Sequence, residues 1–270
     1  MTIIEKLDNH SLKIIINRLE RGNSLDPLTL VQLRKSLLQA QSNSEVKVII
    51  LTGLGNKDFT TGIDLKEARS LSKENILNLS NIAGDIATLL FYGKPSIVAM
   101  NGRTMGMGIV FAIASDYRLI VQDAIMQMPE INASIFPGAT CTAIMTRVCG
   151  LTTTRKLLYF GNVFTPEYAL KENIADEIVS SVEELEERTK FIASELLSKD
   201  LMTLKKIKSA INNALDLNFK TAIALESTLL NINLDKDFDK TITDFKLEYE
   251  LHGNPAKLLE EYNELNGSND

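Results

Sequence analysis

Asp58-Phe59-Thr60-Thr61-Gly62-Ile63-Asp64-Leu65 is the first of two glycine turns that decide the fold, and the second is Asn101-Gly102-Arg103-Thr104-Met105-Gly106-Met107-Gly108-Ile109-Val110. Each follows a β-like apolar run and leads into a helix-like stretch. A helix start leaves backbone N–H groups without intrahelical partners, and a glycine lets the chain turn them toward one point. Two such turns can hold a negative oxygen, which suggests chemistry on an enolate beside the lone carboxylate of Glu130.

Outward from the turns, strand-like and helix-like segments alternate. Asp26-Pro27 predicts a helix start with Asp26 as N-cap, and Asp64 is most simply the N-cap of a short helix. The crossovers are long enough for parallel pairing, so the pattern predicts an α/β fold. Predicted strands cover residues 12–17, 45–52, 96–100, 117–121, 124–128 and 176–179, and predicted helices cover residues 26–40, 72–92 and 106–115.

The C-terminal half has a different pattern. From Ala139 onward nearly all segments carry helical spacing. The clearest are residues 191–197, 201–215, 222–234, 240–249 and 255–265. We therefore predict a β-rich core over residues 1–180 and a helical segment over residues 181–270.

Composition excludes several classes of protein. The 270 residues are 44% hydrophobic, ample for a core, and the net charge of −6 comes without a basic stripe that would bind nucleic acid. The two histidines, His10 and His252, lack ligand-like neighbours, which argues against a metal site or a Ser-His-Asp triad. We predict that Cys141 and Cys149 are buried free thiols. Without a signal peptide or a long apolar run, we expect a cytoplasmic protein with no membrane segment.

Further motifs join the two turns within about residues 12 to 180, and together they resemble the crotonase superfamily, the enoyl-CoA hydratase/isomerase family. The matching pieces are Ile14-Ile15-Ile16-Asn17-Arg18, Asn23-Ser24-Leu25, residues 48–51 and 59–65, Lys94-Pro95, Met100-Asn101-Gly102, Asp116-Tyr117-Arg118, Pro129-Glu130 and Phe136-Pro137-Gly138. The resemblance implies a crotonase-like ββα spiral core with a C-terminal helical trimerisation segment, in a homotrimer or a dimer of trimers. It also implies an acyl-CoA substrate, with coenzyme A as part of that substrate and no other cofactor.

By the same resemblance, the thioester oxygen accepts hydrogen bonds from the N–H groups of Ile63 and Met107. The first turn, with Thr60, Thr61 and Gly62, then borders the substrate. Two residues depart from the family pattern, because Thr61 stands where Ala is usual and Met107 where Gly is usual.

The resemblance also implies a path for coenzyme A. The adenine and pantetheine are expected along Asn23, Ser24 and Leu25 and along the backbone of residues 59–61. Arg18 and Arg21 are candidates for the phosphates, although a solvated surface role is an equally good interpretation of each. Lys240 and Lys246 are further candidate cations.

The position of Val110 decides the predicted reaction. Hydratases resembling this chain have a glutamate there and a second one after a proline, and only the second is present, as Glu130. Adding water needs one group to deprotonate the water and another to protonate the α-carbon. A single carboxylate suffices to carry one proton from C2 to C4 of a 3-enoyl-CoA. The pattern is similar to that of Δ3,Δ2-enoyl-CoA isomerases, which predicts an isomerase with Val110 in the substrate pocket.

Two alternatives to the isomerase are open. The same oxyanion hole would serve a hydratase-like enzyme, a hydrolase or a decarboxylase, or the protein could be a catalytically inactive CoA-binding subunit. Glu130 is expected to be buried by its apolar neighbours Met126, Met128, Ile131 and Phe136, which would raise its pKa. Asn132 is a candidate to hydrogen-bond the substrate or the base, or to cap the next turn.

Overall fold

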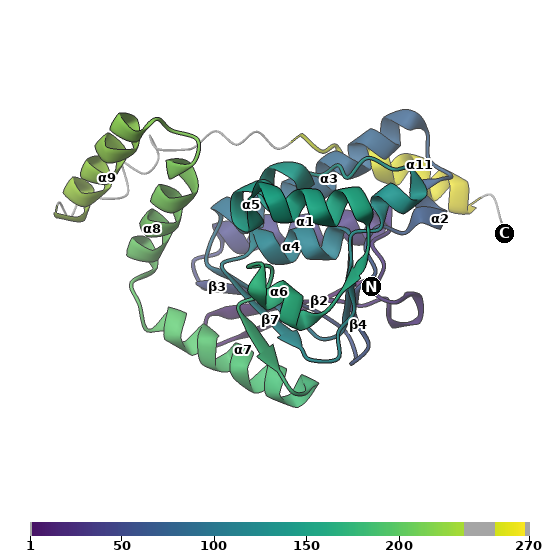
Figure 1. The fold of residues 1–270 in the computed structure, drawn as a ribbon. Helices are drawn as coiled ribbons and strands as arrows, with labels where there is room; N and C mark the ends of the chain where they lie inside the picture. The colour runs from purple at the N-terminus through teal and green to yellow at the C-terminus, as the bar shows by residue number, and fades with distance from the viewer. Residues whose placement is uncertain (1, 235–251, 268–270) are drawn as a thin grey trace.

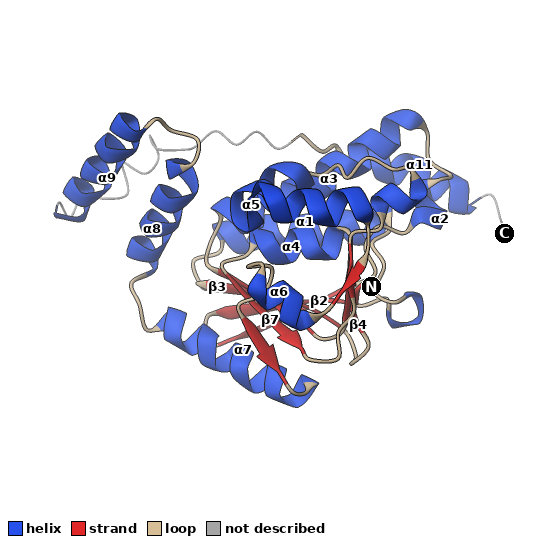
Figure 2. Cartoon of the chain, in the orientation of Figure 1, coloured by secondary structure: helices blue, strands red, loops and turns tan. Residues whose placement is uncertain are grey.

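The computed structural model describes residues 2–234 and 252–267. A six-stranded sheet runs through the body (Figure 2). Its strands follow the order β1-β2-β3-β5-β7-β10. Strand β1 pairs antiparallel with β2, and every other neighbouring pair is parallel. The bounds are β1 Ile3–Asp8, β2 Ser11–Ile16, β3 Val48–Gly53, β5 Ser96–Met100, β7 Tyr117–Val121 and β10 Glu177–Val179.

A smaller sheet holds four short strands in the order β4-β6-β8-β9. Strands β4, β6 and β8 pair in parallel, and β9 joins β8 antiparallel. Their bounds are β4 Asp58–Thr60, β6 Arg103–Met105, β8 Met126–Gln127 and β9 Val163–Phe164. This sheet matters for function because its strands carry the two glycine turns.

Helices cover both faces of the large sheet. The layer of α1, α3, α4 and α5 lies over one face, and α7 packs against β3, β5 and β7 on the other (Figure 2). Asp26 caps α1 by accepting a hydrogen bond from Thr29 N at 2.7 Å, and Asp64 caps α2, so both predicted caps are confirmed. The bounds are α1 Pro27–Ser42, α2 Leu65–Ala68, α3 Lys73–Tyr92, α4 Met107–Ala114, α5 Cys141–Phe160, α6 Pro166–Lys171 and α7 Val182–Leu197.

The last described helices divide into two groups. Helices α8 (Leu201–Ala214) and α9 (Phe219–Leu234) stand to one side of the body, whereas α11 (Pro255–Gly267) packs on α1 and α3 (Figure 1). The predicted helix over residues 240–249 lies outside the described residues. The boundary at residue 180 stays a prediction, and both α7 and α11 contribute buried side chains to the core, such as Leu185 and Leu258.

The α/β prediction is confirmed, and most of its elements lie where the pattern placed them. The sequence reading missed β1, because charged residues at its exposed edge interrupt the apolar run, and it missed β4, β6 and β9, which are two or three residues long. The cysteines are free, as predicted, with Cys141 buried and Cys149 half-buried. Burial raises the pKa of the Cys141 thiol to about 12 and that of Cys149 to about 11, so neither is a nucleophile at neutral pH.

Lys94 offers a test of what holds α1 against the large sheet. Its buried ammonium donates to Ala40 O, Asn43 O and Val46 O at 2.7–2.8 Å, at the C-terminal end of α1 where carbonyls lack helical partners. Lys94→Met should lower the free energy of unfolding by about 3 kcal/mol, since it leaves buried carbonyls without donors. Urea unfolding measures this change. The exposed Lys199→Met is the control, and equal effects of both substitutions would refute this role of Lys94.

Candidate functional site

The small sheet brings three predicted site residues to one edge. Strands β4, β6 and β8 are parallel neighbours, and Ile63, Met107 and Glu130 each follow one of them within a few residues. The carboxyl ends of parallel strands meet at the same edge of a sheet. Pairing of Thr104 with Met126 and of Met105 with Gln127 fixes the second turn beside the carboxylate strand.

The two turns approach one another closely at Gly62. This residue has φ +82°, and a Cβ there would lie 2.9 Å from Met105 O and 3.5 Å from Met107 N. A side chain would therefore suffer both an unfavourable backbone angle and a collision with the second turn. Glycine is required because the backbones of the two turns are in contact.

The N–H groups of Ile63 and Met107 are available to a ligand. Across residues 2–234 and 252–267, neither group donates a hydrogen bond to the protein, whereas Gly62 N, Asp64 N and Gly106 N do. On either side of Ile63, Leu25 N donates to Gly62 O at 2.8 Å and Asp64 N donates to Leu25 O at 3.0 Å. Met107 opens the apolar helix α4, where the helix dipole adds positive potential. Together the two groups can hold an oxyanion.

Glu130 begins a short 3-10 helix, η2 (Glu130–Ala133), next to the second turn. A Cβ on Gly106 would lie 2.7 Å from its Oε1, so the carboxylate lies directly against that glycine. Its Oε2 is buried, and no donor in the described part of the chain reaches it. Burial raises the pKa of Glu130 above its ordinary value, as predicted, which suits a group that both takes up and returns a proton.

The source of that burial differs in part from the prediction. Met126 and Met128 are buried, but Ile131 is 47% exposed and Phe136 is 77% exposed. The segment after Glu130 turns outward and leaves these two side chains at the surface. The prediction was wrong for them because apolar character in a loop does not decide which way the side chain points.

Asn132 anchors the carboxylate loop. Its Nδ2 donates to Gly161 O at 3.0 Å, and Gln127 Nε2 donates to the same carbonyl at 2.8 Å. Ile135 N also closes the turn onto Glu130 O at 2.9 Å. The amide is thus bound to the end of α5, so Asn132 fixes the loop that carries Glu130.

Val110 is 1% exposed and packs in the apolar core of α4. Its N–H donates to Gly106 O at 3.3 Å, one helical turn before it. At the place where a second carboxylate would stand, the structure therefore has an aliphatic side chain that can neither bind nor activate water.

Several residues of the expected coenzyme A path use their polar groups for hydrogen bonds within the protein. Thr60 Oγ1 accepts from Gly62 N, and Thr61 N donates to Gly22 O. Asn23 is fully buried, its amide donates to Leu54 O and Asp58 O, and its backbone N–H donates to Arg18 O, so it holds neighbouring loops together. Ser24 Oγ donates to Asp64 Oδ2 at 3.0 Å.

Arg18 does not face solvent as a phosphate ligand would. It is 8% exposed and forms ion pairs with Asp26 and Asp64, each at 3.2 Å. The predicted phosphate contact from Arg18 is therefore wrong, because burial between two carboxylates occupies its guanidinium. Arg21, whose side chain is 43% exposed beside Glu67, stays a candidate. Lys240 and Lys246 lie outside the described residues.

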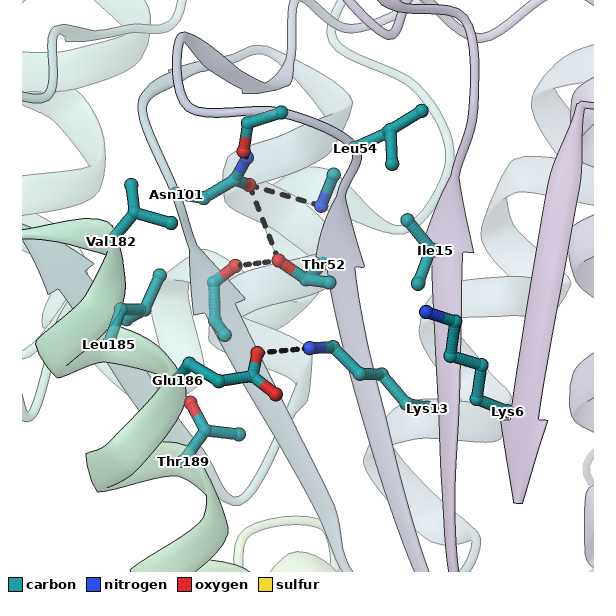
Figure 3. Close-up of a pocket in the computed structure, with 13 residues that line it drawn as sticks. Lys6, Lys13, Ile15, Thr52, Leu54, Asn101, Val182, Leu185, Glu186 and Thr189 are labelled. Carbon is teal, nitrogen blue, oxygen red and sulfur yellow. Dashed lines mark hydrogen bonds and ion pairs between the residues drawn. The ribbon is translucent and has the colours of Figure 1, made fainter. Parts of the chain in front are cut away.

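A cavity of about 220 Å³ lies elsewhere, between the large sheet and α7 (Figure 3). Thr52, Asn101 and Thr189 line it, and the ion pair of Lys13 with Glu186 crosses it. None of the predicted site residues borders this cavity. Among the described residues, no helix has the length and apolarity to span a membrane, and no group of three or more His, Cys, Asp or Glu side chains is placed to hold a metal ion.

Comparisons with known proteins point in the same direction as the geometry. A family model described as enoyl-CoA hydratase/isomerase matches residues 8–250. The short-chain-enoyl-CoA hydratase of Clostridium acetobutylicum is 28% identical over 215 residues, which are 79% of this chain and 82% of that protein. The crotonyl-CoA hydratase of Syntrophomonas wolfei is 27% identical over 226 residues, 83% of this chain and 86% of that protein.

Solved structures share the fold. The crystal structure of enoyl-CoA hydratase from Bacillus anthracis superimposes with a TM-score of 0.83 at 26% identity. The match covers 94% of this chain and all of that one. The two-sheet core with its flanking helices is therefore the crotonase fold.

Glu130 should make stability depend on pH. Above the ordinary pKa of a glutamate, the unfolded chain loses this proton while the folded protein keeps it, so the free energy of unfolding falls as pH rises across that interval. Glu130→Gln removes this penalty. The variant should be more stable than the wild type at pH 8, by about 1 kcal/mol, and the difference should vanish near pH 4.

Urea unfolding at both pH values measures the effect. Glu195→Gln, on the exposed side of α7, is the matched control and should show no such pH-dependent gain. A Glu130→Gln protein that is no more stable than wild type at pH 8 would contradict the buried, unpaired carboxylate.

Proposed function

This chain belongs to the enoyl-CoA hydratase/isomerase family, and we propose that it is a Δ3,Δ2-enoyl-CoA isomerase in which Glu130 alone carries the proton. The observation that carries the proposal is a single buried carboxylate beside two free backbone donors, with Val110 where a second acid would be needed for hydration.

In the proposed reaction, the thioester oxygen of a 3-enoyl-CoA accepts hydrogen bonds from Ile63 N–H and Met107 N–H. Ionised Glu130 removes a proton from C2, and the electron pair spreads over the dienolate, whose oxygen both N–H groups stabilise. The protonated Glu130 then returns the proton at C4 to give the 2-enoyl-CoA. One oxyanion donor contributes about 2.7–4 kcal/mol in other enzymes, so both turns are needed for a useful rate.

The binding of coenzyme A follows from the same loops. We propose that pantetheine and adenine run along the loop of residues 23–25 and the backbone of residues 59–61, with Arg21 as the exposed cation for the phosphates. Burial of Arg18 removes the other candidate from this strip.

We also propose a homotrimer or a dimer of trimers, which rests on apolar side chains exposed on α8, on α9 and between them. Helices α8 and α9 and the turn between them expose large apolar side chains, which the described part of the chain leaves uncovered. They are Ile207, Ile211, Leu215, Phe219, Ile223 and Leu230.

An assay with 3-hexenoyl-CoA tests the proton shuttle. The wild type should form 2-hexenoyl-CoA, and Glu130→Gln should reduce kcat by about 10²–10⁴, since a positioned acid–base group contributes that factor. Because the ionised form starts the reaction, kcat of the wild type should rise with pH through the raised pKa of Glu130. Equal product from the mutant would show that another residue is the base.

Hydration is the second candidate, because the two relatives compared above are named as hydratases. Product analysis with crotonyl-CoA separates it from isomerisation. We expect hydration at least 100-fold slower than isomerisation of 3-hexenoyl-CoA, since a lone carboxylate cannot both activate water and protonate the α-carbon. Comparable rates would favour a hydratase, and binding of both thioesters without turnover would favour an inactive CoA-binding subunit.

A further inference from the structure

The buried Arg18 connects the starts of two helices. Asp26 caps α1, and Asp64 caps α2 by accepting a hydrogen bond from Glu67 N at 3.3 Å. The guanidinium lies between them, with NH2 at 3.2 Å from Asp26 Oδ2 and NH1 at 3.2 Å from Asp64 Oδ2. All three side chains are at most 10% exposed, so water screens these charges little.

The same guanidinium holds the loop that faces the first oxyanion donor. Its NH1 donates to Ser24 O and Ser24 Oγ, both at 2.9 Å, and Ser24 Oγ donates onward to Asp64. Next in the chain, Leu25 binds the backbone on both sides of Ile63. The direction of Ile63 N–H is therefore set by two short loops that Arg18 ties together.

Both carboxylates need this cation. Burial acts to raise the pKa of Asp64, but hydrogen bonds from Glu67 N, Ser24 and Arg18 outweigh it and hold the pKa below its ordinary value. Without Arg18, two buried carboxylates would lose the cation that they share. Because buried charges without a partner are costly, the two loops would rearrange to expose them.

The C-terminal helix α11 reaches the same cluster. Tyr262 OH donates to Asp26 Oδ2 at 3.2 Å, across most of the length of the chain. The segment before α11 is bound to α3, where Asp85 accepts hydrogen bonds from His252 N and Gly253 N at 2.9 and 3.0 Å. Docking of α11 therefore places Tyr262 against the group that Arg18 already holds.

We propose that Arg18 is a positioning residue that orients the Ile63 N–H toward the oxyanion, and that Tyr262 couples this orientation to the docking of α11. The inference rests on the proposed function, since it assigns a role within the same oxyanion hole. In this role Arg18 does not bind a phosphate of coenzyme A. It affects only how well the transition state is stabilised.

The two roles differ in which substrates they affect. A positioning residue changes kcat with every thioester, including an acyl-pantetheine that lacks the phosphates and adenine. A phosphate ligand changes KM, and only with the full acyl-CoA. We expect Arg18→Met to lower kcat about 100-fold with both 3-hexenoyl-CoA and 3-hexenoyl-pantetheine, the loss that a displacement of about 1 Å can cause.

Two milder variants guard against loss of folding. Arg18→Lys keeps the charge but cannot span both carboxylates, so it should also lose kcat, whereas a phosphate role would be largely preserved. Tyr262→Phe removes only the hydroxyl and should lower kcat about threefold to tenfold with KM unchanged. The controls are Arg118→Met, which breaks a partly buried ion pair with Asp176 next to β7 and β10, and Tyr159→Phe at an exposed site.

Amide hydrogen exchange gives a readout that needs no turnover. The amides of Leu25 and Asp64 should exchange faster in Arg18→Lys and Tyr262→Phe than in wild type or in either control. A loss confined to 3-hexenoyl-CoA, or unchanged exchange at both amides, overturns the proposal. If wild type turns over neither thioester, the proposed function fails, and the exchange rates still decide whether Arg18 and Tyr262 order these loops.

Discussion

Parallel pairing of β4, β6 and β8 is the constraint on which the site depends. The strands are only two or three residues long, yet their alignment sets Ile63, Met107 and Glu130 along one edge. The contact between Gly62 and the Met105 carbonyl then fixes the spacing of the two turns, because backbone meets backbone with no side chain between. Any residue with a Cβ at Gly62 would separate the two donors that must share one oxygen.

The charges around this edge show why Glu130 differs from the other buried acids. Asp26, Asp64 and Asp85 each lie against an arginine, and each is also a hydrogen-bond acceptor for backbone N–H groups. These acids serve as caps and anchors. Glu130 has a buried oxygen without a donor among the described residues, and burial raises its pKa. A buried carboxylate oxygen without a donor costs stability, and the raised pKa that accompanies it suits a group that transfers protons.

Arg18 shows that the role of a side chain depends on its burial. In the sequence, an arginine shortly before Asn23-Ser24-Leu25 is equally compatible with a phosphate contact and a surface role. In the fold, it is neither, since two helix caps and Ser24 enclose it. Tyr262 could not be connected to this cluster from the sequence at all, because its partner Asp26 lies near the other end of the chain and no local pattern links them.

The sequence by itself determined the α/β class, the caps at Asp26 and Asp64, the two glycine turns and the single carboxylate, because these depend on local periodicity, on backbone freedom and on which residue is present. It did not reveal β4, β6 and β9, which are two or three residues long and whose pairing partners are distant in the chain. Only the tertiary structure decided that the two turns touch, that Phe136 points outward and that Arg18 is enclosed. Those facts depend on which surfaces meet, and a side chain's burial and charge partners exist only once distant segments have packed together.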